Sequence, residues 1–133
     1  NDVLSTVSRS EADFGLNYVG TQEPRLDFEP VLKESFVLAC LHDHPLARKR
    51  KVKWAELAAY DYMSVTKASG NRYLLDMALT RHATRPRWFC EAQHVSTLVS
   101  LVEAGLGIAA VPRLAMPAGA SFLSIRISFR ECR

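Results

Sequence analysis

Residues 93–112 constrain the fold more than any other part of the sequence, because a helix pattern leads there directly into an apolar strand pattern. Apolar side chains recur at the i, i+3, i+4 spacing of an amphipathic helix, at Val95, Leu98, Val99, Leu101 and Val102. We expect Ser96 to cap the start of this helix and Gly105 to end it, since a helix C-terminus favours a residue with positive φ. Residues 106–111 are typical of a buried strand that stops at Pro112. This order predicts a parallel sheet covered by helices.

The same alternation extends along the rest of the chain. Further strands are predicted over residues 12–20, 28–32, 34–41, 60–65, 87–91 and 122–129, and helices over residues 2–10, 52–58 and 72–82. The stretch 35–41 is almost wholly apolar, so we expect it to form a central strand. Strands that alternate with helices of about ten residues favour βαβ units. The predicted fold class is therefore α/β, with mixed, mostly parallel sheets.

Composition excludes several classes of protein. With 48% hydrophobic and 23% charged residues, the 133-residue chain does not resemble a disordered protein. No stretch reaches the roughly 18 apolar residues of a membrane-spanning helix, and the first residues lack the pattern of a signal peptide. Cys40, Cys90 and Cys132 are odd in number and form no C-x-x-C pair, so neither a disulfide framework nor a zinc site is expected. Free thiols fit a reducing cytoplasm.

Much of the net charge of +3 comes from one basic run, Arg48-Lys49-Arg50-Lys51-Val52-Lys53. Domains that bind nucleic acid usually spread their basic residues along a face or a helix, with aromatic or polar residues between them. A single clustered run therefore favours a solvated surface segment. Contact with an anion or with nucleic acid is the alternative.

His42, Asp43 and His44 are residue types that bind metals, but no second cluster of ligands accompanies them and Pro45 follows directly. A turn capped by Asp43 is therefore favoured over a metal site. Pro45 suits the first turn of a helix because it lacks an N–H group that would need a partner.

Catalytic motifs are equally incomplete. Ser69-Gly70 lies outside any G-x-S-x-G elbow, and no base is marked as its partner. Gly105-Leu106-Gly107 follows a helix and precedes a strand, which is the reverse of a phosphate-binding turn, so helix capping and close packing are favoured. No paired carboxylates or activated nucleophile were found. We expect no catalytic residue, no metal and no cofactor.

Polar segments at strand ends and helix starts are better candidates for binding. They are residues 18–20, 66–71 and 93–97. Ligands of open α/β sheets bind beyond the carboxyl ends of the strands, and helix N-termini offer free N–H groups to an anion. Ser69 and Ser96 lie at two such helix starts, where each can cap its own helix, contact a ligand, or do both.

Three stretches together resemble the effector domain of LysR-type transcriptional regulators. They are Ala12-Asp13-Phe14-Gly15-Leu16; Asp43-His44-Pro45-Leu46-Ala47 followed by Trp54-Ala55-Glu56-Leu57; and Val102-Glu103-Ala104-Gly105-Leu106-Gly107-Ile108-Ala109 with Val111-Pro112. Each motif is weak alone, but their order and spacing are fairly specific. The resemblance covers residues 3–127.

The resemblance implies a two-lobe fold like that of periplasmic solute-binding proteins, with a ligand cleft between the lobes. Residues 1–40 and 119–133 would belong to the first lobe, and residues 41–118 would form the second. The residues that would face the cleft are Tyr18 and Val19 from the first lobe, and Thr66, Ser69, Gln93, His94 and Ser96 from the second. The effector would be a small organic acid or a similar metabolite.

The resemblance also implies the partners of the whole regulator. Effector binding would shift the lobes and reorient DNA-binding domains within a homodimer or tetramer. DNA would be bound only through a helix-turn-helix domain that this chain lacks, and no membrane partner is expected. The family's first strand, first helix and second strand are not found here, and the C-terminal part is short. Tyr18 is bulky where the family often has a small residue, which would reshape the pocket.

Two other functions fit a fold of this kind. An extracytoplasmic solute-binding protein would share the fold but would carry a signal peptide upstream, whereas a regulator would carry a helix-turn-helix there. An enzyme is disfavoured because the chain lacks the catalytic pairs described above. The free cysteines favour the cytoplasmic regulator.

Overall fold

The computed structural model describes residues 2–17, 23–80, 82, 85–118 and 122–128, and of the side chains in residues 122–128 only that of Ile125. The chain divides into two units, Asn1–Lys33 and Glu34–Arg133. The predicted α/β fold is confirmed in the second unit, which contains a mixed sheet covered by helices.

In its described residues, 2–17 and 23–33, the first unit contains one helix, α1 (Asp2–Ser8), and no residue of this helix is buried. Gly15 approaches this helix so closely that a Cβ there would lie 2.5 Å from Cγ1 of Val3. The strands predicted over residues 12–20 and 28–32 are wrong in their described parts, because residues 12–17 and 28–32 form no strand. Several apolar side chains remain exposed, at Phe14, Leu16, Phe28, Val31 and Leu32. The apolar pattern of these two segments did not produce strands, because no described strand pairs with them through backbone hydrogen bonds.

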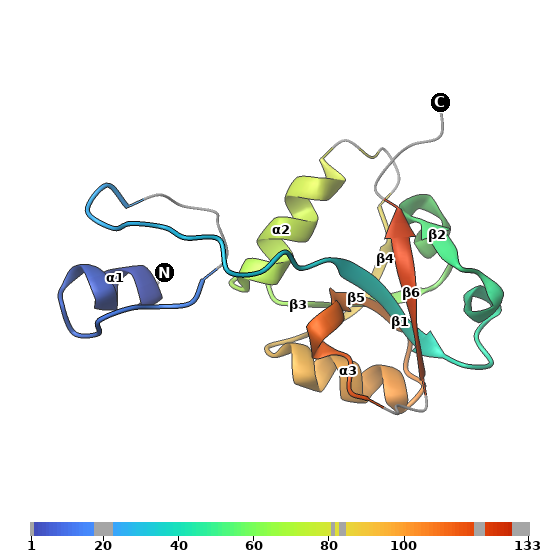
Figure 1. Cartoon of the computed structure of the whole chain (residues 1–133). Helices are drawn as coiled ribbons and strands as arrows, with labels where there is room; N and C mark the ends of the chain where they lie inside the picture. Colours follow the sequence, from blue (N-terminus) through green and yellow to red (C-terminus); the bar gives the residue numbers. More distant parts are fainter. Residues whose placement is uncertain (1, 18–22, 81, 83–84, 119–121, 129–133) are drawn as a thin grey trace. The chain divides into compact units, whose positions relative to one another are not determined.

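The second unit is built on a six-stranded sheet in the order β2-β6-β1-β5-β3-β4 (Figure 1). The strands are β1 (Phe36–Leu41), β2 (Lys51–Lys53), β3 (Asp61–Val65), β4 (Arg87–Ala92), β5 (Ile108–Pro112) and β6 (Phe122–Ser128). β1 is antiparallel to both β5 and β6, whereas the pairs β2–β6, β3–β4 and β3–β5 are parallel. One strand therefore opposes five that run the same way. β1 has a neighbour on each side, so its central position is confirmed.

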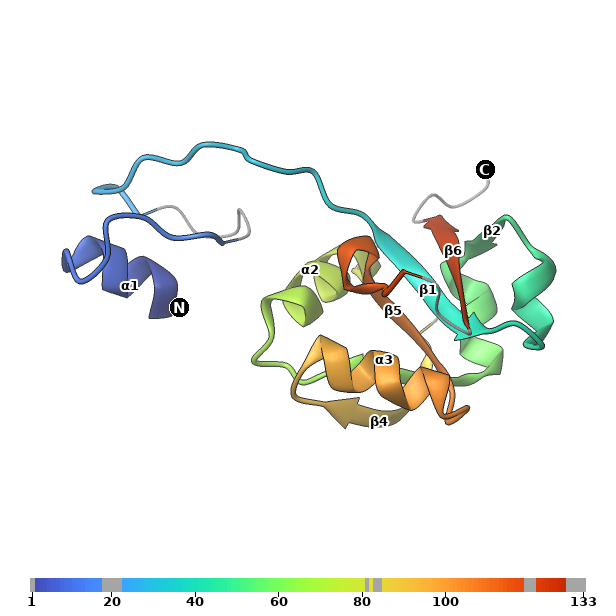
Figure 2. The same ribbon diagram turned by 60° about the horizontal axis from the view of Figure 1, so that its bottom comes forward.

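Helices cover both faces of this sheet (Figure 2), and alternate residues of β1 and of β5 enter two different cores. Leu75 and Leu79 of α2 (Gly70–Leu79) belong to one core, together with Leu38 of β1. Leu98 and Val102 of α3 (Val95–Glu103) belong to the other, with neighbouring strand residues. The short 3-10 helices η1 (Pro45–Arg48) and η2 (Trp54–Ala59) join the α2 side through Leu46, Trp54 and Leu57. The second unit is thus an α/β/α sandwich.

The two glycines after α3 have the structural roles that the sequence predicted. Gly105 has φ +81°, its N–H donates to the carbonyl of Val102 at 2.9 Å, and the N–H of Leu106 donates to that of Leu101 at 3.1 Å. This pair of hydrogen bonds is a Schellman motif, which favours glycine. Gly107 lies against β3, where a Cβ would be 2.5 Å from the carbonyl oxygen of Asp61.

Two predicted helix caps are wrong by one or two residues. The N-cap of η1 is His44 and not Asp43, because Nδ1 of His44 accepts the N–H of Leu46 at 3.2 Å. The N-cap of α3 is His94 and not Ser96, because the first backbone bond of the helix runs from Leu98 N–H to the carbonyl of His94 at 3.1 Å. Ser96 therefore lies within the first turn, and its hydroxyl does not cap the helix.

The strands at both ends of the second unit belong to the same sheet. β1 and β6 pair with each other, and β1 also pairs with β5. Because β1 and β6 lie in one sheet, the residues from Glu34 onward form a single unit, and the chain divides between Lys33 and Glu34. The lobe boundaries after residues 40 and 118 stay a prediction for the intact two-lobe domain.

Cys40 and Cys90 are free thiols. Cys40 is fully buried in β1, and this burial raises the pKa of its thiol to about 11, so it is a poor nucleophile. Cys132 lies outside the described residues. Among the helices of the described residues, none is long and apolar enough to cross a membrane.

Candidate functional site

Two loops with predicted binding residues meet at one edge of the sheet. β3 and β4 are parallel neighbours, and Val65 pairs with Ala92 at their carboxyl ends. The N–H of Thr66 then donates to the carbonyl of Ala92 at 3.0 Å. The segment from Thr66 to Ser69 and the segment from Gln93 to Ser96 therefore leave the sheet side by side. This edge is the place where open α/β sheets bind ligands.

The side chains of these loops are accessible. Thr66 and Ser69 are half-buried, whereas Gln93, His94 and Ser96 are exposed. Neither Ser69 at the start of α2 nor His94 at the start of α3 makes a side-chain capping hydrogen bond. Within the described part of the chain, the polar groups of these five residues are thus available at the surface of one edge.

Two helix N-termini also face this edge. The first backbone bond of α2 runs from Tyr73 N–H to the carbonyl of Ser69 at 3.1 Å, and that of α3 starts at Leu98. The N–H groups of the first three residues of each helix consequently have no acceptor within the helix. They add partial positive charge at the N-termini, which favours an anion.

The edge continues to β5 and to the start of β1. The N–H of Arg113 donates to the carbonyl of Ser35 at 2.9 Å, which holds the end of β5 beside the beginning of β1. Glu34 accepts hydrogen bonds through its carboxylate from the N–H of Ser35 at 2.8 Å and from the N–H of Leu114 at 3.3 Å. Sequence reasoning missed Glu34, because its partner Leu114 is 80 residues away along the chain.

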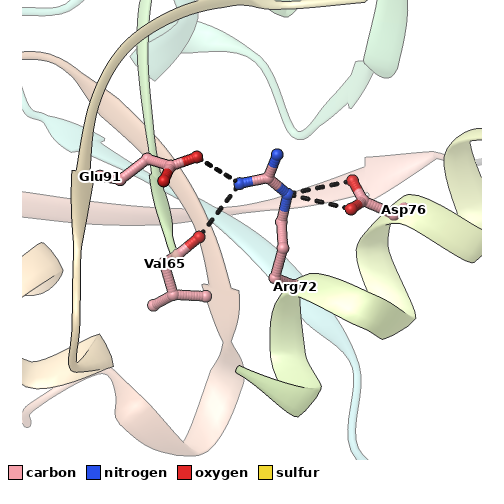
Figure 3. Close-up of polar contacts among 4 residues, drawn as sticks. All are labelled: Val65, Arg72, Asp76 and Glu91. Atoms are coloured by element: carbon pink, nitrogen blue, oxygen red, sulfur yellow. Dashed lines mark hydrogen bonds and ion pairs between the residues drawn. The ribbon is translucent and has the colours of Figure 1, made fainter. Parts of the chain in front are cut away.

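Arg72 links elements that meet at this edge through the hydrogen bonds drawn in Figure 3. Arg72 lies in the first turn of α2, and its side chain is 6% exposed. Nη1 donates to the carbonyl of Val65 at 3.1 Å and to Oε1 of Glu91 at 2.8 Å. Nε donates to both carboxylate oxygens of Asp76, each at 3.1 Å. One guanidinium therefore ties the start of α2 to the ends of β3 and β4.

The charge of Arg72 is maintained by its partners. Burial acts to lower the pKa of Arg72, but the hydrogen bonds from Arg72 to Glu91 and Asp76 outweigh it, and the pKa is raised. The guanidinium carbon also lies 3.9 Å from the centroid of the Trp88 ring, and Trp88 contacts the edge of Tyr62 with ring centroids 5.2 Å apart. A cation over an aromatic face is a favourable contact. The sequence placed Arg72 in a helix but offered no signal for these partners.

The histidine cluster has a structural use. Besides capping η1, His44 packs edge-on against Tyr60 with ring centroids 4.7 Å apart. Burial lowers the pKa of His44, and the charge of Asp43 opposes this effect. Among the described residues, no group of three or more His, Cys, Asp or Glu side chains is arranged to hold a metal ion.

Tyr18 and Val19, the two predicted site residues of the first unit, lie outside the described residues. The other five predicted residues share the edge of the second unit. Hydroxyl, amide and imidazole groups beside two helix N-termini are suited to holding a small polar or anionic molecule.

Comparison with known proteins links this geometry to one family. A family model described as the LysR substrate binding domain matches residues 1–129. The uncharacterised HTH-type transcriptional regulator YbhD of Escherichia coli (strain K12) is 46% identical over 117 residues, which are 88% of this chain and 37% of that protein. The regulator YfeR of Shigella flexneri is 34% identical over 115 residues, 86% of this chain and 37% of that protein. The chain thus spans little more than a third of the length of these relatives.

Solved structures give the same fold. The effector-binding domain of QuiR in complex with shikimate matches with a TM-score of 0.79 and 22% identity, over 98% of this chain and 63% of that one. The regulatory domain of Synechocystis PCC6803 CcmR in complex with 2-PG has a TM-score of 0.75 and 20% identity, over 95% of this chain and 62% of that one. At these identities the likeness establishes the fold.

Proposed function

The chain belongs to the family of LysR substrate-binding domains, and from this membership we propose that it senses a small organic acid or related anion at the edge formed by β3, β4, α2 and α3. Effector-binding domains of this family bind small-molecule effectors. The proposed binding residues are Thr66, Ser69, Gln93, His94 and Ser96, with Tyr18 and Val19 from the first unit as further predictions.

One observation carries the proposal. Two helix N-termini, and the two segments that carry the five polar residues, lie where two neighbouring parallel strands end. The hydroxyls of Ser69 and Ser96 and the amide of Gln93 can donate to a carboxylate, and the N–H groups of the first turns add donors that need no side-chain reorganisation. Arg72 bonds to the ends of β3 and β4, from which both loops leave the sheet, without exposing its own charge.

In the whole regulator, effector binding would change the arrangement of DNA-binding domains within a dimer or tetramer. A ligand can do this only by binding one arrangement more tightly than the other. The relatives are transcriptional regulators, which favours regulation over solute transport. We infer a role in binding without catalysis, in the cytoplasm, where DNA is present and where free thiols persist.

The test is thermal unfolding of the chain against a panel of small acids that includes shikimate, 2-phosphoglycolate, aromatic acids and amino acids. A compound at 100 times its dissociation constant adds about 2.7 kcal/mol of stability. For a domain of this size the transition should move up by roughly 5–15 °C. We expect at least one acid to give this shift.

Substitution then locates the site. Ser96→Ala and Gln93→Ala should abolish the shift, whereas Ser100→Ala, one turn further along α3, should keep it. Ser100 is a matched control because its exposed hydroxyl donates to the carbonyl of Ser96 at 3.1 Å within the helix. If an active compound stabilises all three variants equally, binding occurs elsewhere and the proposed site is wrong.

A further inference from the structure

The basic surface, formed by Arg48, Lys49, Arg50, Lys51 and Lys53, is separate from the proposed effector site. Its residues span the end of η1 and the edge strand β2. The register pairs both Lys51 of β2 and Val37 of β1 with Arg126 of β6, and Val37 also pairs with Val111 near the end of β5. The β2 part of this surface is thus level with the carboxyl end of β5, and its separation from the proposed effector site is across the width of the sheet. Strands β6, β1 and β5 separate β2 from β3. An effector bound at the loops of β3 and β4 therefore does not account for these charges.

The positive charge of the basic surface is largely uncompensated. All five side chains are exposed. Lys49 forms an ion pair with Glu56, whose carboxylate also accepts the N–H of Lys53 at 2.8 Å. Within the described ranges, no carboxylate forms an ion pair with Arg48, Arg50 or Lys51. Five cations around one carboxylate concentrate more positive charge here than the net +3 of the whole chain.

Protection of a sheet edge explains only part of this surface. Lys51 and Lys53 flank buried Val52, and exposed lysines on an edge strand discourage pairing with another sheet. Arg48, Lys49 and Arg50 precede β2, so they have no such role. The mutual repulsion of these cations is relieved when a polyanion replaces their counterions.

We propose that the basic surface binds the phosphate backbone of double-stranded DNA without reading its sequence. Lys51 and Lys53 are two residues apart on one strand and point to the same side, which spaces them by about 6.6 Å. Phosphates follow one another every 3.4 Å or so along the axis of each DNA strand, so several cations of this surface can be engaged at once. The relatives are HTH-type transcriptional regulators, so DNA is the polyanion that we expect a protein of this family to contact. This surface goes beyond the proposed effector function, because it needs neither an effector nor the loops of β3 and β4. It also departs from the expectation that DNA is bound only through a helix-turn-helix domain.

The test is fluorescence anisotropy of a labelled duplex of mixed sequence, titrated with the chain between about 20 and 200 mM salt. We expect the logarithm of the binding constant to fall linearly with the logarithm of the salt concentration. Each phosphate contact contributes about 0.9 to the slope. The double variant Arg50→Gln/Lys51→Gln should lower the slope by about 1.8 and weaken binding at low salt by about tenfold or more.

Lys33→Gln/Arg85→Gln is the matched control, since it removes the same charge from two exposed residues elsewhere. It should keep the slope and most of the affinity, and both double variants should keep the circular dichroism melting curve of the parent. An equal loss in the two variants would indicate general attraction and overturn the proposal. So would the absence of binding at 20 mM or so of salt, or stronger binding of an acidic polypeptide than of the duplex.

Discussion

The two units of this chain contain similar apolar residues and use them differently. In the second unit, Leu38 and Ala39 of β1 enter opposite cores, and both are fully buried. In the first unit, Phe14 and Leu16 are two residues apart in a stretch predicted to be a strand, yet they are 79% and 74% exposed. An apolar pattern therefore specifies a strand only where neighbouring strands and covering helices bury both faces.

The largest expected effect comes from removing a core side chain. Leu38→Ala should destabilise the second unit by about 2–5 kcal/mol, because a buried leucine leaves a cavity. Leu32→Ala, at a residue that is 67% exposed in the first unit, should change stability by less than about 0.5 kcal/mol. Urea unfolding followed by tryptophan fluorescence measures this, since Trp54 and Trp88 both lie in the second unit. Similar losses in the two variants would remove the contrast between the units.

Two glycines extend the comparison, because a Cβ added at either one would make a contact of the same length. A Cβ at Gly107 would lie 2.5 Å from a backbone carbonyl of β3, and a Cβ at Gly15 would lie 2.5 Å from a side-chain methyl of Val3. The carbonyl is fixed in a sheet, so Gly107→Ala should cost about 1–3 kcal/mol by overpacking. α1 has no buried residue and can move, so Gly15→Ala should leave the urea midpoint of the second unit unchanged. A fall in that midpoint from Gly15→Ala as large as the fall from Gly107→Ala would contradict this contrast between the two glycines.

Substitution of Arg72 tests whether this residue stabilises the loops of the second unit. Arg72→Met should destabilise it by about 1–2 kcal/mol, since it removes hydrogen bonds to charged partners that are themselves partly exposed. The fluorescence of Trp88 should change as well, because the guanidinium lies over its ring. Arg25→Met removes an exposed ion pair with Glu23 from the first unit and should have almost no effect. An Arg72→Met protein with unaltered stability and fluorescence would contradict the proposed support.

The smallest expected effect is a dependence on pH. Burial lowers the pKa of His44 below its ordinary value of 6.5, so the unfolded state binds a proton more readily. Stability should be full above pH 6.5 and should fall as the pH drops through the folded-state pKa. The pKa of Glu56 is lowered from its ordinary value of 4.5, chiefly by the hydrogen bond from Lys49. Glu56 therefore changes the pH dependence of stability only below pH 4.5.

His44→Asn isolates this effect, because asparagine can still cap η1 but does not titrate there. It should flatten the decline in melting temperature between about pH 7 and 5, whereas His42→Asn should preserve it. All four histidines lie in the second unit. A decline that persists in His44→Asn would mean that another group of that unit causes it.

The sequence predicted best where local residues decide the structure. Residues 93–112 form the expected helix, glycine cap and strand, because the periodicity of α3 and the positive φ of Gly105 depend on near neighbours. The predicted N-caps of η1 and α3 were wrong by one or two residues. Several adjacent polar residues could cap each helix, and the cap is fixed only by where the backbone hydrogen bonds of the helix begin. Alternative caps differ little in energy.

Distant contacts could not be predicted in the same way. β2 has only three residues, two of them lysines, and its strand conformation comes from pairing with β6 more than 70 residues later. Arg72 finds Glu91 across 19 residues, and Glu34 meets the N–H of Leu114 across 80. The family resemblance supplied the five site residues of the second unit, and the strand pattern placed their segments at the ends of parallel strands. The parallel pairing is confirmed for β3 and β4.

The most direct test of the central claim is a map of amide chemical-shift changes as the isotope-labelled chain is titrated with the pooled small acids, each at about 1 mM, where even weak complexes form. The account predicts that the largest changes fall on residues 66–72 and 92–97, while residues 48–53 change little. Largest changes elsewhere in the second unit, or none in those two segments with any acid, would contradict the proposed effector site.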